Sequence, residues 1–536
     1  MSLFCDYTYQ DWENAENKER LIPEIINRYK GSDDFQKGLE ANAYFSGDNS
    51  AIMSKVIMQP DVIKVQTDKG ERKTLTNKEI VGNRCSNNFL YRFVVQQNQF
   101  LLGNGVTLKD DEQKKKLGRA FDTKLQETGE NALLHGVSWG YWNYDHIESI
   151  EAVKDAYSGF VALLDELTSE PKVGIQFWQI ASNKPMGVRL FEQDGVTVYR
   201  FGRSMDANGK PSEAYSNIEI IEPKRAYKIK TLKDGNGSTV IGESNYPILP
   251  IVPLYANKEH RSELTANIKN KIDLYDRIIS DFGDNLDRAN DVYWVLNNFG
   301  GTSNDIIEMI DQINRIKAVV NQSNAVGGGA TAEPRTIEVP YNARATALDL
   351  LRKALYQDYM ALDMDEIKGG SLTNVAIQTA TANLNLKADR YEWQCIDFVQ
   401  KILFLVGIVG EDAEKISFVR RCISNDSETI QNIYTMRDDV SQEWALKTNP
   451  YVNSDEIDDI IKQQENEQDK KLKKAEEAQQ RQMLMQGANN AVKGANGDGE
   501  LQEGQVGQSQ QAESSEGQKG QEVSPKSSKT DEETEE

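Results

Sequence analysis

The amino-acid sequence predicts an α+β fold that is mainly helical. Apolar residues at helical spacing occupy much of the N-terminal region and most of the chain after residue 260. Between them, from about Val173 to Pro253, short β-type runs are separated by Gly, Asn and Asp turns. After Gln464 the chain consists mainly of Gln, Glu, Gly, Ser and Lys. Because such a composition buries little apolar surface, we expect a charged helical stub that continues into a tail that is disordered beyond about Lys474.

Length and charge limit the class of protein. The 536 residues are enough for two to four domains at about 100–200 residues each. The formal net charge of -22 argues against a surface that grips nucleic acid tightly, but not against one that nucleic acid slides past. The first residues lack the apolar core of a secretory signal, and the longest apolar run, Ile402 to Gly410, is far shorter than the ~20 residues of a membrane helix. We therefore expect a soluble protein made in the cytoplasm.

The first third of the chain contains several helical segments. Residues 8–47 place Ile22, Ile25, Ile26 and Tyr29 at helical spacing. A second helix lies within residues 83–108 and ends at Gly103. A third helix, within residues 123–145, is followed by an aromatic strand.

A long helix is predicted directly after the Pro-containing apolar run "IVPLY". The helical pattern extends from Ser262 to Leu296, which is ~35 residues or ~50 Å. One face carries Leu264, Ile268, Ile272, Tyr275, Ile279, Phe282, Leu286 and Tyr293. On the other side, within a sector of about 80°, lie Asp273, Asp276, Asp284, Asp287 and Asp291. The simplest interpretation of the acidic sector is a solvated face with Asp273–Arg277 and Asp284–Arg288 pairs.

Two more helices follow in the C-terminal half. The first covers about Ala343 to Met364, and "DEIKGGSLTN" separates it from a helix that begins at Val375. The second contains a packing seam of Leu384, Ala388, Tyr391, Cys395, Phe398, Ile402 and Leu405, spaced by alternating steps of four and three. Cys395 is therefore interpreted as a core residue rather than a reactive thiol. "KISFVRRCI" is expected to include a strand.

The sequence offers little support for an enzyme. The chain has 3 histidines and no Gly-x-Ser-x-Gly or Walker A motif, and His135 lies at the apolar end of a helix as a hydrogen-bonded core residue would. The "GNG" and "GGG" runs lack the strand–loop–helix context of nucleotide sites. The 4 cysteines are far apart, and no Asp, Glu or His cluster has metal-ligand spacing. We expect no catalytic activity, no cofactor and no metal.

The order of these segments resembles that of the portal proteins of tailed bacteriophages, the head–tail connector family. The resemblance rests on "NRYKGSDDFQKGLEANAYFSGDN", "FLLGNGVTL", "ENALLHGVSWGYWNYD", "PILPIVPLYANKEHRSELTANIKNKIDLYDRIISD" and "GGSLTNVAIQTATANLNLKADRYEW". Each stretch alone is degenerate, but together, in the family's order, they cover about residues 20–465. The last segment of the chain departs most from the family pattern.

The resemblance implies a portal fold assembled as a ring of twelve with a central channel for double-stranded DNA. Its parts would be a wing (1–258), a first stem helix (259–297), a clip (298–340), a second stem helix (341–362), a tunnel loop (363–374), a kinked helix and crown (375–464), and a polar tail (465–536). Implied partners are other copies of the chain, DNA, the terminase motor, head–tail adaptor proteins, and major capsid and scaffold proteins. The implied location is the portal vertex of the virion, reached from the host cytoplasm.

Two sets of residues are candidate DNA neighbours. In the tunnel loop, Gly369 and Gly370 permit unusual backbone angles, Ser371 or Thr373 can cap the next helix, and Lys368 is the expected phosphate partner. An ordinary interhelical turn is the alternative. The aspartates of the long helix would make the channel wall repel phosphate. A structural minor capsid or scaffold-type virion protein without a DNA channel remains the alternative function.

Overall fold

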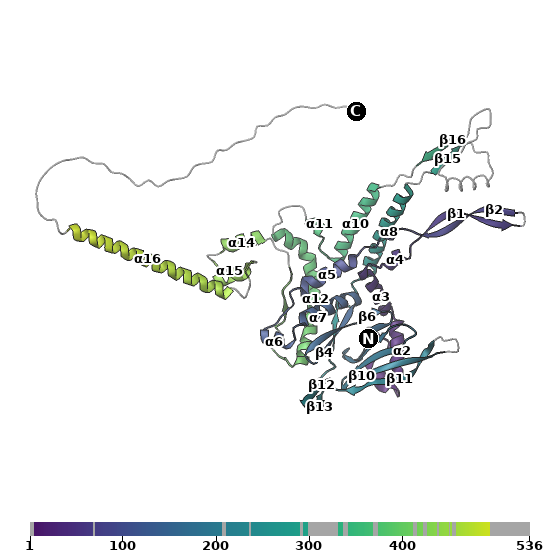
Figure 1. Ribbon diagram of the computed structural model, residues 1–536, viewed down its shortest axis with the longest axis horizontal. Coiled ribbons are helices and arrows are strands. Elements are labelled where there is room, and N and C mark those ends of the chain that lie inside the picture. Colours follow the sequence, from purple (N-terminus) through teal and green to yellow (C-terminus); the bar gives the residue numbers. More distant parts are fainter. Residues whose placement is uncertain are drawn as a thin grey trace. The chain divides into compact units, whose positions relative to one another are not determined.

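The computed structural model describes residues 5–493 apart from 68–69, 206–210, 235–236, 290–292, 298–330, 336–340, 368–373, 411–414, 422–425, 437–438, 450 and 453–456. The chain divides into two compact units, Met1–Gln431 and Asn432–Glu536. Figure 1 labels those elements of both units for which there is room.

The chain begins with short helices, as the sequence predicts. They are α1 (Tyr9–Asn14), α2 (Lys18–Lys30), α3 (Asp33–Ser46) and α4 (Ser50–Met53). The side chains of Thr8, Asn17 and Ser32 accept hydrogen bonds from the first turns of α1, α2 and α3. The predicted apolar face of α2, from Ile22 to Tyr29, is fully buried.

A two-stranded hairpin follows that the sequence analysis did not assign. Its strands β1 (Val56–Thr67) and β2 (Gly70–Val81) pair antiparallel in continuous register. Next come α5 (Phe89–Leu102), β3 (Val106–Thr107), α6 (Asp111–Lys116) and α7 (Phe121–His135). The second and third predicted helices are thus present as α5 and α7, and the expected aromatic strand follows α7 as β4 (Val137–Asn143).

Two antiparallel sheets pack face to face in the first unit. One has the order β14-β4-β5, with β5 at His146–Glu151 and β14 at Ile251–Tyr255. The other has the order β11-β10-β9-β8-β7-β6. Its strands are β6 (Val153–Asp155), β7 (Ser158–Leu164), β8 (Pro171–Gln179), β9 (Met186–Glu192), β10 (Gly195–Met205) and β11 (Pro211–Arg225). Rings from the two sheets meet in the core, as for Trp139 and Phe160, 5.1 Å apart. A separate hairpin joins β12 (Lys228–Asp234) and β13 (Gly237–Ser244).

The long helix after β14 is shorter than the sequence predicts. Helix α8 spans Ala266–Ala289, and Tyr293–Asn297 form strand β15, which pairs with β16 (Thr331–Arg335). The expectation of one helix through Leu296 is therefore wrong at its C-terminal end, and Tyr293 does not belong to the helix face. Residues 298–330 of the proposed clip lie outside the described residues.

The remaining helices of the first unit match their predicted positions closely. Helix α10 covers Tyr341–Tyr359, the short α11 covers Met364–Ile367, and α12 covers Asn374–Val406. The packing seam of α12 from Leu384 to Leu405 is buried, as predicted. Cys395 is fully buried, and burial raises the pKa of its thiol well above the ordinary value. The predicted strand after α12 is β17 (Ser417–Phe418), which pairs with β3.

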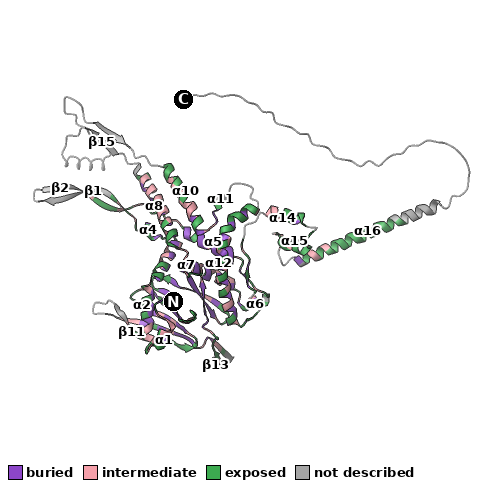
Figure 2. Ribbon diagram, turned by 180° about the vertical axis from the view of Figure 1, so that it is seen from behind, coloured by how far each residue is buried: buried purple, intermediate pink, exposed green. Residues whose placement is uncertain are grey.

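The C-terminal elements are helical. Helix α14 (Asp426–Thr435) lies at the boundary of the two units, and α15 (Gln442–Thr448) and α16 (Ile457–Lys493) belong to the second. The exposed surface of α16 is visible as green in Figure 2. Helix α16 continues to Lys493, whereas the composition predicts disorder from about Lys474. Residues 494–536 lie outside the described residues.

Candidate functional site

The acidic sector of α8 is a row of hydrogen-bonded carboxylates that fastens this helix to residues 44–87. Asp273 accepts a hydrogen bond from the Tyr44 hydroxyl and one, at 3.0 Å, from Lys269 Nζ. Further along the helix, Ser280 Oγ accepts from the main-chain N–H of Cys85 at 2.9 Å. Residues one helical turn apart lie on the same side of the helix, so the row keeps contact with one neighbouring segment.

Asp276 lies at the centre of this row and is fully buried. It accepts hydrogen bonds from the side-chain amides of Asn49 and Asn87, the latter at 2.7 Å. Burial raises the pKa of Asp276 to about 6, although both amides oppose the rise. This carboxyl group is therefore stabilised by neutral donors rather than by a cation.

Asp284 is held differently, by a charged partner. Its carboxylate lies 2.6 Å from Lys55 Nζ and also 2.6 Å from the main-chain nitrogen of Asn83. Burial alone would raise its pKa, but Lys55 and Asn83 together hold the pKa below the usual range. Asp287 accepts from Asn83 Nδ2 at 2.6 Å and remains exposed.

These contacts correct part of the sequence-based prediction. Asp276 is 0% and Asp284 7% exposed, so neither can present a carboxylate to an open surface. Asp273 pairs with Lys269 rather than Arg277, and Asp284 pairs with Lys55. Asp291 lies outside the described residues. The partners Asn49, Lys55, Asn83 and Asn87 were missed, although the polar run "NRCSNN" fits neither helical nor strand periodicity and is a usable signal.

Helices α8 and α10 form an antiparallel pair. Near one end, Asp358 receives a hydrogen bond of 2.5 Å from Asn267 Nδ2 and an ion pair from Lys271. Near the other end, the rings of Phe282 and Tyr341 lie 6.0 Å apart. On the predicted apolar face, Ile268 and Ile272 are buried in the core, whereas Leu286 is 48% exposed.

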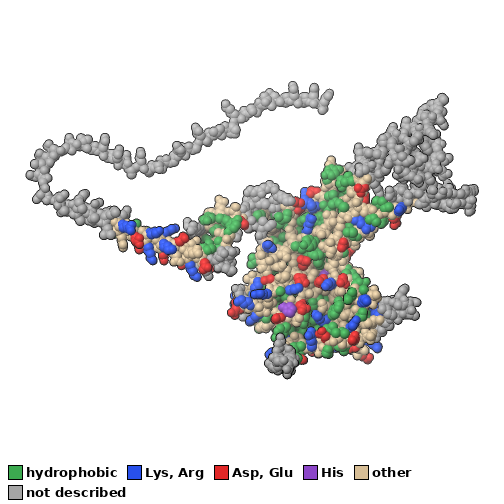
Figure 3. All heavy atoms as spheres, viewed as in Figure 1, with side chains coloured by type: hydrophobic (Ala, Val, Ile, Leu, Met, Phe, Trp, Pro, Cys, Tyr) green, Lys and Arg blue, Asp and Glu red, His purple; other side chains and the backbone are tan. Residues whose placement is uncertain are grey.

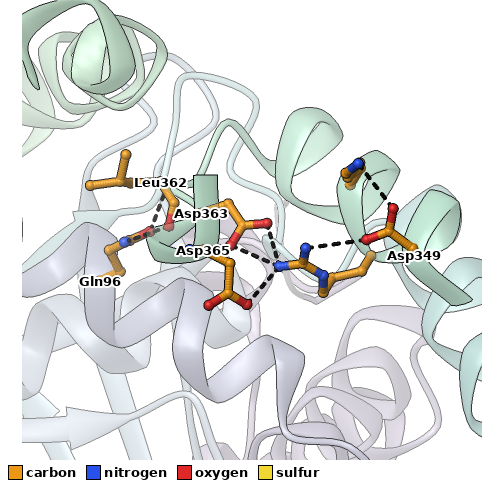
Figure 4. Close-up of polar contacts among 7 residues, drawn as sticks. Gln96, Asp349, Leu362, Asp363 and Asp365 are labelled. Carbon is orange, nitrogen blue, oxygen red and sulfur yellow. Dashed lines mark hydrogen bonds and ion pairs between the residues drawn. The ribbon is translucent and has the colours of Figure 1, made fainter. Parts of the chain in front are cut away.

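The chain between α10 and α11 is fixed by the hydrogen bonds of Gln96 and the ion pairs of Arg352, which together are called the polar lock. Leu362 donates its N–H to Gln96 Oε1 at 3.0 Å, and its carbonyl accepts from Gln96 Nε2 at 3.1 Å. Arg352 Nη1 lies 2.7 Å from Asp363 and 3.0 Å from Asp365. Figure 4 shows Asp349, Asp363 and Asp365 converging on this guanidinium. The candidate tunnel-loop residues Lys368, Gly369, Gly370, Ser371 and Thr373 begin one residue after α11 and lie outside the described residues.

A largely buried lysine on α12 joins one end of the helix pair, where α8 begins and α10 ends, to the body of the first unit. Lys387 Nζ lies 2.7 Å from Glu263, just before α8, and donates to the carbonyl of Tyr359, the last residue of α10, at 2.9 Å. Burial lowers the pKa of Lys387, and Glu263 partly opposes this shift. Met360, which follows Tyr359 directly, has a positive φ of 63°, so the chain turns sharply where α10 ends.

The described part of the chain holds no candidate metal site. No group of three or more His, Cys, Asp or Glu side chains there could hold a metal ion. His135 Nε2 lies 2.7 Å from Asn42 Oδ1, and burial lowers its pKa to about 4, as expected of a core histidine. Among the described helices, none is long and apolar enough to cross a membrane. Lys, Arg, Asp and Glu side chains are intermixed on the face shown in Figure 3.

Comparisons with known proteins agree with the resemblance seen in the sequence. The portal protein of Clostridium phage phiCD119 is 23% identical over 411 residues, which are 73% of this chain and 84% of that protein. The portal protein of Bacillus phage SPP1 is 25% identical over 401 residues, 70% of this chain and 74% of that protein.

Solved structures of lower similarity come from gene transfer agent particles. A chain in the virion of a native particle is 10% identical, with a TM-score of 0.34, over 69% of this chain and 88% of that chain. A chain in the neck of a native particle, computed with C12 symmetry, is also 10% identical, with a TM-score of 0.33, over 68% and 90% of the two chains.

The model of the family described as phage portal protein, SPP1 Gp6-like, matches residues 30–470. That range begins at the end of α2, contains every element from α3 to α15 and ends within α16. It includes the carboxylate row, the helix pair and the polar lock. The chain therefore belongs to the SPP1 Gp6-like family of phage portal proteins.

Proposed function

We propose that this protein is a phage portal protein whose copies form a dodecameric ring at one vertex of the capsid, with a channel through which double-stranded DNA is packaged and later ejected. The family match over residues 30–470 carries the proposal. In this assignment terminase docks on the ring during packaging and head–tail adaptor proteins dock afterwards, while major capsid and scaffold proteins surround it. The role is structural and not catalytic.

The described elements can be assigned to the parts of a portal protein. Helices α8 and α10 form the stem, β15 and β16 begin the clip, and the two sheets with the preceding helices form the wing. Residues 363–374 serve as the tunnel loop, and the chain from α12 onward forms the kinked helix and crown. The antiparallel α8–α10 pair supports this assignment, since a 24-residue helix is ~36 Å long and suits a channel wall.

Two groups of side chains are proposed to lie near DNA. Lys368 in the tunnel loop is the candidate phosphate partner, and Gly369, Gly370, Ser371 and Thr373 complete that loop. Of the aspartates, Asp287 is the exposed candidate among the described residues, and Asp291 is the other. Carboxylates beside the channel would repel phosphate and so prevent DNA from being held tightly.

Negative-stain electron microscopy of the purified protein tests the proposal. Rings with a central hole are expected, and mass photometry should give a mass near twelve times 60.4 kDa. Rods or monomers at every concentration would instead favour a minor capsid or scaffold-type protein. Loss of DNA-filled heads in a phage that lacks this protein, with restoration by the wild-type chain, would connect the ring to packaging.

A further inference from the structure

The open side of α8 carries a groove that the chain itself does not fill. The groove has a volume of about 590 Å³ and lies between α8 and the segment formed by α4 and the start of β1. Its floor on the α8 side includes Leu274, and Val56 on its other wall is 49% exposed. Arg277 also lines it, is exposed, and makes no ion pair with any described residue.

The groove faces away from the core. At 100° per residue, the stripe of Asn270, Leu274, Arg277 and Asp281 lies roughly opposite the buried Ile268 and Ile272. The groove borders the carboxylate row centred on Asp276, and Asp273 of that row and Lys55 also line it. A partner could therefore enter the groove without displacing the core contacts of Ile268 and Ile272.

Helix α10 exposes a complementary surface on its far side. Leu350 is 63% exposed, whereas Leu355 and Tyr359, which lie on the packed side of α10, are buried. The carboxylate of Asp349 is 48% exposed, with Lys353 and Arg352 of the same helix as its cations. An exposed leucine beside an accessible carboxylate matches the groove, where Leu274 lies beside the guanidinium of Arg277. The two carboxylates that also line the groove, Asp273 and Asp281, already pair with Lys269 and Lys55.

The groove residues of α8 and the exposed residues of α10 also lie at matching positions along the helix axes, here called their heights. Because α8 and α10 run antiparallel, each residue forward on α8 is level with one residue back on α10, in steps of ~1.5 Å. The contacts Asn267–Asp358 and Phe282–Tyr341 set this scale. By this correspondence Leu274 of α8 is level with Leu350 of α10, and Arg277 is within about two residues of the level of Asp349. A rotation about an axis parallel to the helices leaves heights unchanged, so the same levels apply between neighbouring copies.

We infer that the α8 groove of one copy receives the outer face of α10 from the next copy, with Leu350 seated against Leu274 and Asp349 paired with Arg277. The contact is head-to-tail, because the groove and the outer face of α10 are different surfaces of the same chain. A contact of this kind closes into a ring when the rotation between copies permits. The inference rests on the proposed ring and names the side chains that join its subunits.

Charge reversal with rescue tests the pair in the full-length protein. Arg277→Glu and Asp349→Arg should each lower the fraction of protein in rings at least ~tenfold at low salt, because like charges then meet across the contact. The double variant should recover most of that fraction. Arg119→Glu, which reverses another exposed arginine outside the groove, is the matched control and should assemble as wild type does.

A second pair of variants tests the apolar part of the contact. Leu350→Asp should lose rings, whereas Leu167→Asp, at a leucine 92% exposed on a turn, should keep them. Thermal unfolding of each variant shows whether the subunit still folds. Should any charge variant fail to fold, crosslinking of Leu274→Cys with Leu350→Cys by a short bis-maleimide should still give covalent multimers that neither single cysteine variant gives. The background for this test is Cys85→Ser with Cys422→Ser, since Cys5 and Cys395 are buried.

The outcomes separate the two proposals. Rings in the wild type together with unchanged rings in Arg277→Glu and Leu350→Asp would overturn this contact and leave the portal ring intact. Crosslinked multimers from either single cysteine variant would also overturn it. Absence of rings in the wild type would overturn the proposed function itself. Loss in the singles, recovery in the double and multimers only from the cysteine pair would establish the contact.

Discussion

Lys55 Nζ lies 2.6 Å from Asp284 Oδ2 and 2.7 Å from Asp281 Oδ1, which joins the root of the β1–β2 hairpin to α8. The side chains of Lys55 and Asp284 are only 12% and 8% exposed. Removal of one member of such a pair leaves the other charge without compensation in a poorly solvated place.

We expect Lys55→Met to lower the free energy of unfolding by about 3 kcal/mol, because Asp284 would lose its cation. Urea denaturation followed by circular dichroism measures this. Lys18→Met removes a lysine from an exposed pair whose atoms are 3.8 Å apart, and it should cost less than ~1 kcal/mol. Equal losses of unfolding free energy in the two variants would show that the buried pair contributes no more to stability than the exposed pair.

Asp276 should give stability a specific dependence on pH. Its pKa is about 6 in the folded chain, above the ordinary 3.8, so the folded state binds a proton more readily than the unfolded state. The contribution of Asp276 is most favourable below pH 3.8 and is lost as pH rises toward 6. We expect the wild type to gain stability between pH 7 and pH 5 relative to Asp276→Asn. Urea denaturation of both proteins at pH 7 and at pH 5 measures this difference. An equal change in the free energy of unfolding in the two proteins would contradict it.

The tunnel loop should matter for DNA rather than for assembly. We expect Gly369→Pro with Gly370→Pro to leave rings intact but to reduce DNA packaging, because proline restricts the backbone angles that glycine permits. Lys368→Gln should reduce packaging as well, and Lys415→Gln serves as the control for loss of a lysine. Packaging at the wild-type level in the proline variant would refute the loop's proposed contact with DNA.

Asp287 should affect packaging through its charge. We expect Asp287→Lys to leave rings intact and to slow packaging, most strongly at low salt where screening is weakest. Glu170→Lys makes the same change of charge at an exposed position far from α8 in the sequence and serves as the control. Equal rates for Asp287→Lys and wild type at every salt concentration would return Asp287 to an ordinary solvated position.

Limited proteolysis distinguishes the two boundaries proposed for the C-terminal tail. The composition predicts disorder from about Lys474, whereas α16 continues to Lys493. We expect trypsin to cleave after Lys493 before it cleaves among lysines 470, 471, 473 and 474, since a helical backbone is a poorer protease substrate than an extended one. Intact mass spectrometry of a time course identifies the first products. Early cleavage after Lys474 would favour the shorter helix.

Local periodicity predicted most of the helices well. The apolar faces of α2 and α12 repeat at helical spacing and are buried in the core. The end of α8 was not predictable in this way, because Tyr293–Asn297 also fits a helical pattern. Those residues form a strand that pairs with Thr331–Arg335, and this distant partner is not visible in any short window of sequence.

The acidic residues of α8 show the same limit for the candidate site. Helical geometry correctly gathered Asp273, Asp276 and Asp284 on one sector, but it could not identify what faces them. Their partners Tyr44, Asn87 and Lys55 lie about two hundred positions earlier in the chain. Only the folded arrangement turns a sector that looks solvated into a buried row.

Lys387 gives the helix pair a mechanical property. One ammonium group holds the chain just before α8 and the last carbonyl of α10, so both helices are pinned to α12 at the same end. Contacts from Asp273 to Asp287 also hold α8 along its length, so sliding α8 past α10 would have to break both sets of contacts. A force on this helix pair would therefore be shared between α12 and the segment of residues 44–87, and would not fall on one element alone.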